Sequence, residues 1–193
     1  MLNTAFRSLL APGLLAAATV LAAPAFAQQA LVPAQSQISF TAKQMGVPVS
    51  GQFKQFKANV AFDPAKPEAA SIQFTVDTGS ATMGVKESDA ELPKSTWFNV
   101  PKFPQATFQS TSVKKLAKDK FEVAGKLTIK GVSSNVVAPV TLTQNGATTV
   151  AAGAFPIKRL TFRIGEEEWS DTSMVADEVQ VKFSVALTGV AKL

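Results

Sequence analysis

Apolar and polar residues alternate with a period of two along most of this chain, as in residues 179–187, where every second residue is valine, phenylalanine or leucine. This period is typical of a β-strand with one buried face. The same alternation predicts strands at 37–42, 53–62, 72–77, 107–116, 121–129, 136–142 and around 155–157. Within 53–62 the apolar register shifts once, which predicts a β-bulge near Gln55.

Turn-forming residues separate the predicted strands. Asp63-Pro64 ends one of them, Lys118-Asp119 and Asn145-Gly146 are hairpin turn signals, and the charged segment 83–92 predicts a short helix. Seven or eight antiparallel strands follow, without a linker or an internal repeat. We therefore expect an all-β fold, either a single extended antiparallel eight-stranded β-barrel with a short helical insertion or a two-sheet sandwich.

Residues 92–108 interrupt the alternation with a cluster of prolines and aromatic side chains: Pro93, Trp97, Phe98, Pro101, Phe103, Pro104 and Phe108. Proline removes a backbone donor and restricts the residue before it, so a long helix or a central strand is excluded here. The segment is expected to form an irregular cap over an apolar interior. Trp97 and Phe98 form either a mouth for that interior, with Met83 and Leu92 beneath, or a plug that closes it.

The first residues have the pattern of a secretory signal peptide. Arg7 lies in a positive start, an apolar stretch covers 9–23, and Ala25-Phe26-Ala27 is a small-residue cleavage site. We expect residues 1–27 to be removed, leaving a periplasmic chain of residues 28–193 that forms one domain. The alternative is a retained membrane span, which the alanine-rich composition disfavours.

The chain contains neither cysteine nor histidine. Their absence excludes Ser-His-Asp and Cys-His catalysis, thiol redox chemistry and nearly all zinc or copper sites. Ser95 lies beside Lys94 in sequence only, which is no catalytic arrangement. The acidic run 166–168 with Asp171 resembles a calcium or glycosidase site, but it lacks calcium-loop spacing, and consecutive strand residues face opposite sides. We therefore expect a protein that is not an enzyme and has no metal site.

The formal net charge of +5 becomes +4 without Arg7, and the lysines are scattered along the chain. Such scattered charge disfavours a nucleic-acid partner. It serves either for solubility or for attraction to an anionic membrane surface.

Fourteen phenylalanines, two tryptophans and no tyrosine predict an unusually apolar interior. Eight strands enclose enough room for packed side chains or for one slim ligand. The lining candidates are Phe40, Phe53, Phe74, Val76, Phe108, Leu127, Phe155, Ile157 and Phe183. Each of them either touches a ligand or simply belongs to the core.

Several motifs are distributed over residues 34–187: Ser36-x-Ile38-x-Phe40, Met45-Gly46 with Gly51-x-Phe53, Leu92-x-x-Ser95-x-x-Phe98, Phe103-Pro104-x-x-x-Phe108-x-Ser110, Gly125-x-Leu127-Thr128-Ile129-x-Gly131 and Arg159-x-x-Phe162. Together they resemble the YceI-like family of periplasmic proteins that bind polyisoprenoid lipids. The resemblance implies an extended, lipocalin-like barrel whose interior holds an isoprenoid chain, with bound lipid or quinone in place of a cofactor. It also adds Arg159 and Phe162 to the candidate binding residues.

One segment departs from the family pattern. Many relatives show Arg-Asp-x-His-Leu where this chain has residues 88–92, Ser-Asp-Ala-Glu-Leu, so a cationic and an imidazole side chain are missing. Headgroup contacts by those two side chains do not transfer to this chain. Arg159 either meets a headgroup itself or pairs with a carboxylate such as Asp171 or Asp177.

These observations predict a periplasmic carrier or sequestering protein for a long isoprenoid quinone or polyprenyl lipid. A first alternative is an accessory protein for a membrane redox system or a stress response, without obligate lipid. It is suggested by residues 169–179, which resemble a subgroup associated with b561-type cytochromes. A lipid hydrolase or isomerase is a third alternative, disfavoured because no side chain here ordinarily titrates near neutrality. The oligomeric state is left open.

Overall fold

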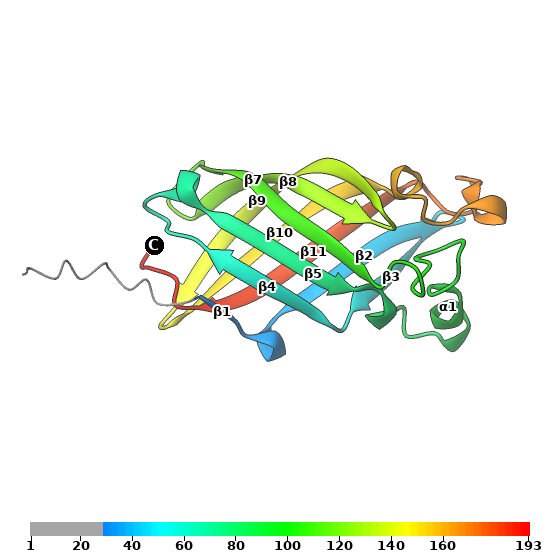
Figure 1. Cartoon of the computed structure of the whole chain (residues 1–193), viewed down its shortest axis with the longest axis horizontal. Coiled ribbons are helices and arrows are strands. Elements are labelled where there is room, and N and C mark those ends of the chain that lie inside the picture. Colours follow the sequence, from blue (N-terminus) through cyan, green and yellow to red (C-terminus); the bar gives the residue numbers. More distant parts are fainter. Residues whose placement is uncertain (1–28) are drawn as a thin grey trace, which may run out of the picture.

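Antiparallel pairing joins every strand of the computed structural model, which describes residues 29–193 (Figure 1). The predicted signal peptide lies outside the described residues. The strands are β1 (Ala30–Leu31), β2 (Gln37–Gln44), β3 (Val47–Phe53), β4 (Phe56–Ala61), β5 (Ser71–Asp77), β6 (Ala81–Thr82), β7 (Gln105–Lys115), β8 (Lys120–Ile129), β9 (Val132–Asn145), β10 (Thr148–Lys158) and β11 (Glu178–Thr188). The helices are α1 (Lys86–Glu91) and the 3-10 turns η1 (Pro33–Gln35), η2 (Pro67–Ala69), η3 (Thr78–Ser80), η4 (Arg159–Phe162) and η5 (Glu167–Ser170).

The order of strands in the sheet is β4-β5-β7-β8-β9-β10-β11-β2-β3-β6, and β1 pairs with the end of β11. The sheet curls around the long axis of the molecule (Figure 1). The all-β antiparallel fold is confirmed, as are the helix before Pro93 and the turn at Asn145-Gly146. The predicted strand number is wrong, because the described residues contain eleven strands rather than eight.

The difference in strand number has two causes. β1 and β6 have two residues each, too few to show any periodicity. The predicted bulge near Gln55 is instead a corner between β3 and β4, which lie toward opposite ends of the strand order. At this corner the Gln55 N–H donates to Ser80 Oγ at 3.0 Å, and the Asp77 N–H donates to the Gln55 carbonyl at 3.0 Å. The chain itself therefore connects the two edges of the curled sheet.

The molecule has two different ends (Figure 1). One end, here the mouth end, carries α1, the β2–β3 turn, residues 92–104, the β8–β9 turn and residues 159–177. The far end carries the C-terminus and the β7–β8 and β9–β10 turns. The long strands run between these two ends, so each set of loops lies at one end of the interior.

Residues 92–104 form an irregular cap, with no strand and no helix beyond Glu91, but the predicted cap of 92–108 is too long, because Phe108 pairs with both β5 and β8 inside strand β7. Short-range hydrogen bonds hold its backbone, including Phe98 N–H to the Leu92 carbonyl at 3.0 Å and Phe103 N–H to the Asn99 carbonyl at 2.8 Å. Leu92 and Phe98 are buried in the main core cluster. The cap is thus packed onto the barrel, and it is not a free loop.

Candidate functional site

The interior contains two cavity sections arranged along the barrel. The mouth section has a volume of about 210 Å³, and the deep section has a volume of about 170 Å³. One water needs only about 10–15 Å³. Five residues line both sections and are called the waist residues below: Ile38, Val76, Leu127, Phe155 and Val181. The two sections therefore lie on either side of one ring of apolar side chains.

Fourteen of the fifteen candidate binding residues line this interior. The mouth section has Phe40, Phe53, Met83, Leu92, Trp97, Phe98, Ile157 and Arg159, and the deep section has Phe74, Phe108 and Phe183. Val76, Leu127 and Phe155 are waist residues. Phe162 lines neither section and is buried in the main core cluster. Its predicted binding role is therefore replaced by a packing role.

Sequence reasoning missed several lining residues. Ile38 and Val181 follow the same alternation as Phe40 and Phe183, so extending that pattern along each strand finds both. Trp169 lines the mouth section from the 3-10 turn η5, whose sequence carries no periodic signal.

Glycines opposite phenylalanines keep three aromatic rings against the barrel wall. A Cβ at Gly51 would lie 2.3 Å from Phe40 Cζ, and one at Gly125 would lie 2.3 Å from Phe108 Cζ. Gly153 pairs directly with Phe183, whose Cζ would be 2.6 Å from an added Cβ. Glycine in a strand costs stability, and an aromatic ring over it restores packing. Because the rings occupy the space of missing side chains, they leave the centre of the interior open.

Arg159 anchors the loops of the mouth end. It is 2% exposed, and its guanidinium donates five hydrogen bonds, to the backbone carbonyls of Ile164, Gly165, Trp169, Val175 and Ala176 at 2.6–3.1 Å. Burial lowers the pKa of this guanidinium, and the nearby Asp177 opposes that shift. Asp177 accepts instead from the backbone N–H of Leu160 at 3.0 Å.

These contacts correct the expectations for Arg159. An arginine has five N–H donors, and all five already have carbonyl partners. Neither Asp171 nor Asp177 is its ion-pair partner among the described residues. Arg159 could donate to a headgroup only by breaking one of these five hydrogen bonds to backbone carbonyls. Arg159 thus connects three parts of the 164–176 segment and forms part of the cavity wall.

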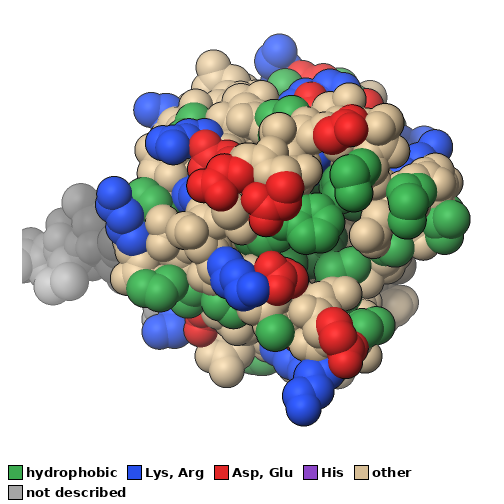
Figure 2. All heavy atoms as spheres, turned by 90° about the vertical axis from the view of Figure 1, so that its right-hand side faces the viewer, with side chains coloured by type: hydrophobic (Ala, Val, Ile, Leu, Met, Phe, Trp, Pro, Cys, Tyr) green, Lys and Arg blue, Asp and Glu red, His purple; other side chains and the backbone are tan. Residues whose placement is uncertain are grey.

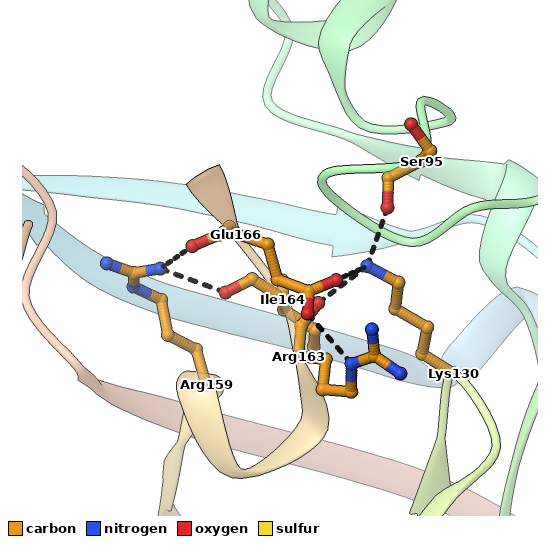
Figure 3. Close-up of polar contacts among 7 residues, drawn as sticks. Ser95, Lys130, Arg159, Arg163, Ile164 and Glu166 are labelled. Carbon is orange, nitrogen blue, oxygen red and sulfur yellow. Dashed lines mark hydrogen bonds and ion pairs between the residues drawn. The ribbon is translucent and has the colours of Figure 1, made fainter. Parts of the chain in front are cut away.

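Lys130 is a second buried cation at the mouth end (Figure 3). Its ammonium donates to the carbonyls of Ser95 and Arg163, both at 2.6 Å, and to Glu166 Oε2 at 2.9 Å. Glu166 also accepts from Arg163 Nε at 2.8 Å. The Lys130 bond, followed by the Arg163 bond, lowers the pKa of Glu166. Lys130 therefore joins the 92–104 cap to the loop after η4. Glu166, the first residue of the acidic run, takes part in this structural contact.

We predict that Glu166→Gln lowers the free energy of unfolding at pH 7 by about 1–2 kcal/mol, because Lys130 loses the carboxylate with which it pairs. A carboxylate with a lowered folded-state pKa stabilises fully above its ordinary pKa of about 4.3 and loses that contribution as the pH falls through the folded-state value. The difference in the free energy of unfolding between the variant and the wild type should therefore become smaller below about pH 4, and urea unfolding repeated at several pH values measures it. Glu168→Gln, an exposed neighbour, is the control, and an equal effect of both substitutions would contradict the assigned role of Glu166.

The two tryptophans pack together in the wall of the mouth section. The ring centroids of Trp97 and Trp169 are 5.6 Å apart, and both indole N–H groups are buried without a hydrogen-bond partner among the described residues. Phe98 is buried and meets Phe53 edge to face at 5.7 Å. Phe98 thus packs as the plug hypothesis expects, whereas half-buried Trp97 lies in the mouth wall.

Ser88 and Glu91 line the mouth section from α1. They occupy the two positions of 88–92 where the family pattern has arginine and histidine. Besides the tryptophans, the polar lining residues of this section are Gln44, Ser88, Glu91 and Arg159, and Thr149 is the polar one of the deep section. The interior is therefore nearly free of polar groups, and the lining of the mouth section includes one carboxylate, Glu91, which pairs with the exposed Lys94.

Within residues 29–193, no group of three or more acidic, histidine or cysteine side chains is arranged to hold a metal ion. In the same part of the chain, no helix has the length and hydropathy needed to cross a membrane.

Comparison with known proteins agrees with this architecture. The curated Protein YceI of Salmonella arizonae is 42% identical over 92 residues, which cover 48% of this chain and 46% of that protein. The matched segments thus span about half the length of the curated relatives. The crystal structure of Burkholderia cenocepacia BcnA superposes with a TM-score of 0.78 at 46% identity, covering 81% of this chain and 98% of BcnA.

A second solved structure shares the fold alone. It is a polyisoprenoid binding domain from Saccharophagus degradans implicated in plant cell wall breakdown, with a TM-score of 0.66 and 14% identity over 83% of this chain and 98% of that domain. The model of the YceI-like domain matches residues 30–187, which contain nearly all the strands described above. The chain therefore belongs to the YceI-like domain family.

Proposed function

We propose that this protein binds one long isoprenoid lipid in its interior and carries or sequesters it in the periplasm without catalysis. The single observation that supports this most is the apolar interior. Its two sections meet at the waist residues, and only a few polar side chains line either of them. The family membership and the polyisoprenoid binding domain of the same fold support the same class of ligand.

Burial of the tail accounts for most of the expected affinity. Each buried methylene contributes about 0.8 kcal/mol, whereas a net hydrogen bond contributes about 1 kcal/mol. A membrane offers the tail similar surroundings, so the protein competes only with a preformed and dry cavity. The three phenylalanine rings held over glycines favour such a cavity, because they pack against the strands where a side chain is missing.

The two buried cations of the mouth end favour a ligand with an uncharged headgroup. All five donors of Arg159 and all three of Lys130 have protein acceptors. Glu91 lines the same section and forms an ion pair with the exposed Lys94. Arg159 is the cation among the lining residues, so a phosphate inside the section would meet a carboxylate and no unpaired lining cation, which disfavours it. Isoprenoid quinones and polyprenols fit this environment better than polyprenyl phosphates.

The accessory role for a membrane cytochrome rests on the resemblance of residues 169–179 to one subgroup. In this structure Trp169, Val175 and Ala176 supply three of the five carbonyls that bind Arg159. That structural role accounts for the segment without a cytochrome partner, so lipid binding is the function proposed.

Purification from the periplasm under mild conditions, followed by organic extraction and mass spectrometry, is expected to recover about one isoprenoid lipid per protein. In binding assays with matched tails, a neutral polyprenol should bind at least about tenfold more tightly than its phosphate, and each shortening of the tail should weaken binding. Protein from which bound lipid has been removed is used for both the headgroup comparison and the tail-length series. Absence of any lipid, together with affinity that ignores tail length, would contradict the proposal.

A further inference from the structure

Most of the exposed large hydrophobic side chains in the described part of the chain are gathered at the mouth end. Four of six lie there: Met45, Val47, Val85 and Met174. Viewed from the mouth end, hydrophobic side chains cluster on one side of the face, next to a hollow, with charged side chains around them (Figure 2). The other two, Leu116 and Val137, lie in the β7–β8 turn and on the outside of β9. An exposed apolar patch of this kind marks an interaction site.

Met45 and Met174 are held next to each other by backbone hydrogen bonds. The Met45 N–H donates to the Met174 carbonyl at 2.8 Å, and the Ala176 N–H donates to the Lys43 carbonyl at 2.9 Å. Met45 and Gly46 form the tight β2–β3 turn, with φ of 47° and 79°. The two methionine side chains, 71% and 43% exposed, therefore belong to one fixed projection, here the methionine tip.

The methionine tip adjoins the opening of the interior. Gln44 and Val175, the residues next to the two methionines, form a β-bridge and line the mouth section. Val85 precedes α1, which contributes Ser88 and Glu91 to the same section. The apolar surface is thus continuous with the cavity in which a lipid tail is proposed to lie.

Charged side chains of both signs surround this surface. Lys43 is exposed beside Met45, and Lys86 and Glu87 are exposed in the first turn of α1, directly after Val85. Asp171 is exposed on the segment that carries Met174. Zwitterionic headgroups carry one phosphate and one ammonium group each, so a mixed rim complements them. Because the rim has two cations and two anions, it gives little net attraction to a uniformly anionic surface.

We infer that the mouth end docks on a bilayer of zwitterionic lipid, with the methionine tip inserted at the headgroup boundary. This inference rests on the proposed function, because the membrane is the source or destination of the lipid. A bilayer suits the site better than a protein partner, since it supplies a tail directly to the opening, which a protein cover would close. Methionine side chains are flexible and adapt to irregular apolar surroundings.

The test compares three forms of the full exported chain, each with its N-terminus checked by mass spectrometry. They are wild type, Met45→Ser/Met174→Ser, and the control Leu116→Ser/Val137→Ser, which removes two equally exposed hydrophobic side chains elsewhere. Flotation with phosphatidylcholine and phosphatidylethanolamine vesicles measures the partition coefficient. The methionine variant should partition about tenfold less than wild type, and the control should stay within about twofold.

Lipid transfer supplies the second measurement. The methionine variant should extract a fluorescent isoprenoid from vesicles about tenfold more slowly, while its affinity for the same probe in detergent solution stays unchanged. Equal partitioning of all three forms would overturn the inference. So would a methionine-dependent dimer in sedimentation velocity without vesicle binding, or a strong rise in partitioning when about a third of the lipid is anionic. Loss of probe binding by every form in detergent would instead contradict the proposed function, and the flotation result would still stand by itself.

Discussion

Replacing Arg159 with methionine is expected to lower the free energy of unfolding by about 4 kcal/mol, because five buried or half-buried carbonyls lose their donors at once. Methionine keeps much of the side-chain volume, so the loss reports hydrogen bonding rather than a cavity. The 164–176 segment should also lose protection in amide hydrogen exchange. Urea unfolding of the ligand-free protein measures the first effect.

Two further variants separate this role from charge alone. Arg159→Lys retains the charge but has three donors, so it leaves at least two carbonyls unpaired and should cost about 2 kcal/mol. Arg163→Met removes an exposed arginine that pairs with Glu166 and should cost less than about 1 kcal/mol. If Arg159→Met costs no more than Arg163→Met, Arg159 does not hold the loops together.

Replacing Leu127 with tryptophan at the waist is expected to weaken binding of a long isoprenoid by about a hundredfold, if the tail passes from one section to the other. Exclusion of only four methylenes from the deep section costs about 3 kcal/mol. A short isoprenoid that fits the mouth section alone should lose less than about threefold, because its contacts are unchanged. Titrations of a tail-length series against both proteins measure the difference.

Lys126→Trp is the matched control, since the side chain before Leu127 is exposed on the outer face of β8. Larger core side chains cost about 1–3 kcal/mol of stability, so both variants are first compared by urea unfolding. If Leu127→Trp does not fold, Val181→Phe tests the same waist from β11. An equal loss for short and long tails in a folded waist variant would contradict a passage between the sections.

Much of the fold was predictable because period-two alternation is a local property. The β-strands with long alternating segments, β7, β8, β9 and β11, were found in this way, and so were nine of the residues that line the interior. The corner at Gln55 was misread as a bulge, since the sequence does not show whether a shift in register continues one strand or starts another. Phe162 was misassigned for a related reason: a motif identifies a residue as important without saying which side of a wall it faces.

The hydrogen-bond partners of the two buried cations could not be predicted from local sequence patterns. Lys130 looked like one of many scattered lysines, yet it bonds Ser95 and Glu166, which lie 35 and 36 residues away. Arg159 was expected to meet a headgroup or a carboxylate, and its five partners are carbonyls. Backbone carbonyls are present at every residue, so no sequence motif marks which of them converge on one guanidinium.

By itself, the sequence determined an all-β domain with an apolar interior, an irregular aromatic cap and no histidine or cysteine chemistry, because alternation, proline and composition act locally or as totals. Tertiary structure alone decided that the interior has two sections, that the two buried cations of the mouth end, Arg159 and Lys130, are fully bonded, and that the exposed methionines meet beside the opening. These features depend on which residues from distant strands face one another. That is set by the pairing of the sheet and the curl that brings its edges together.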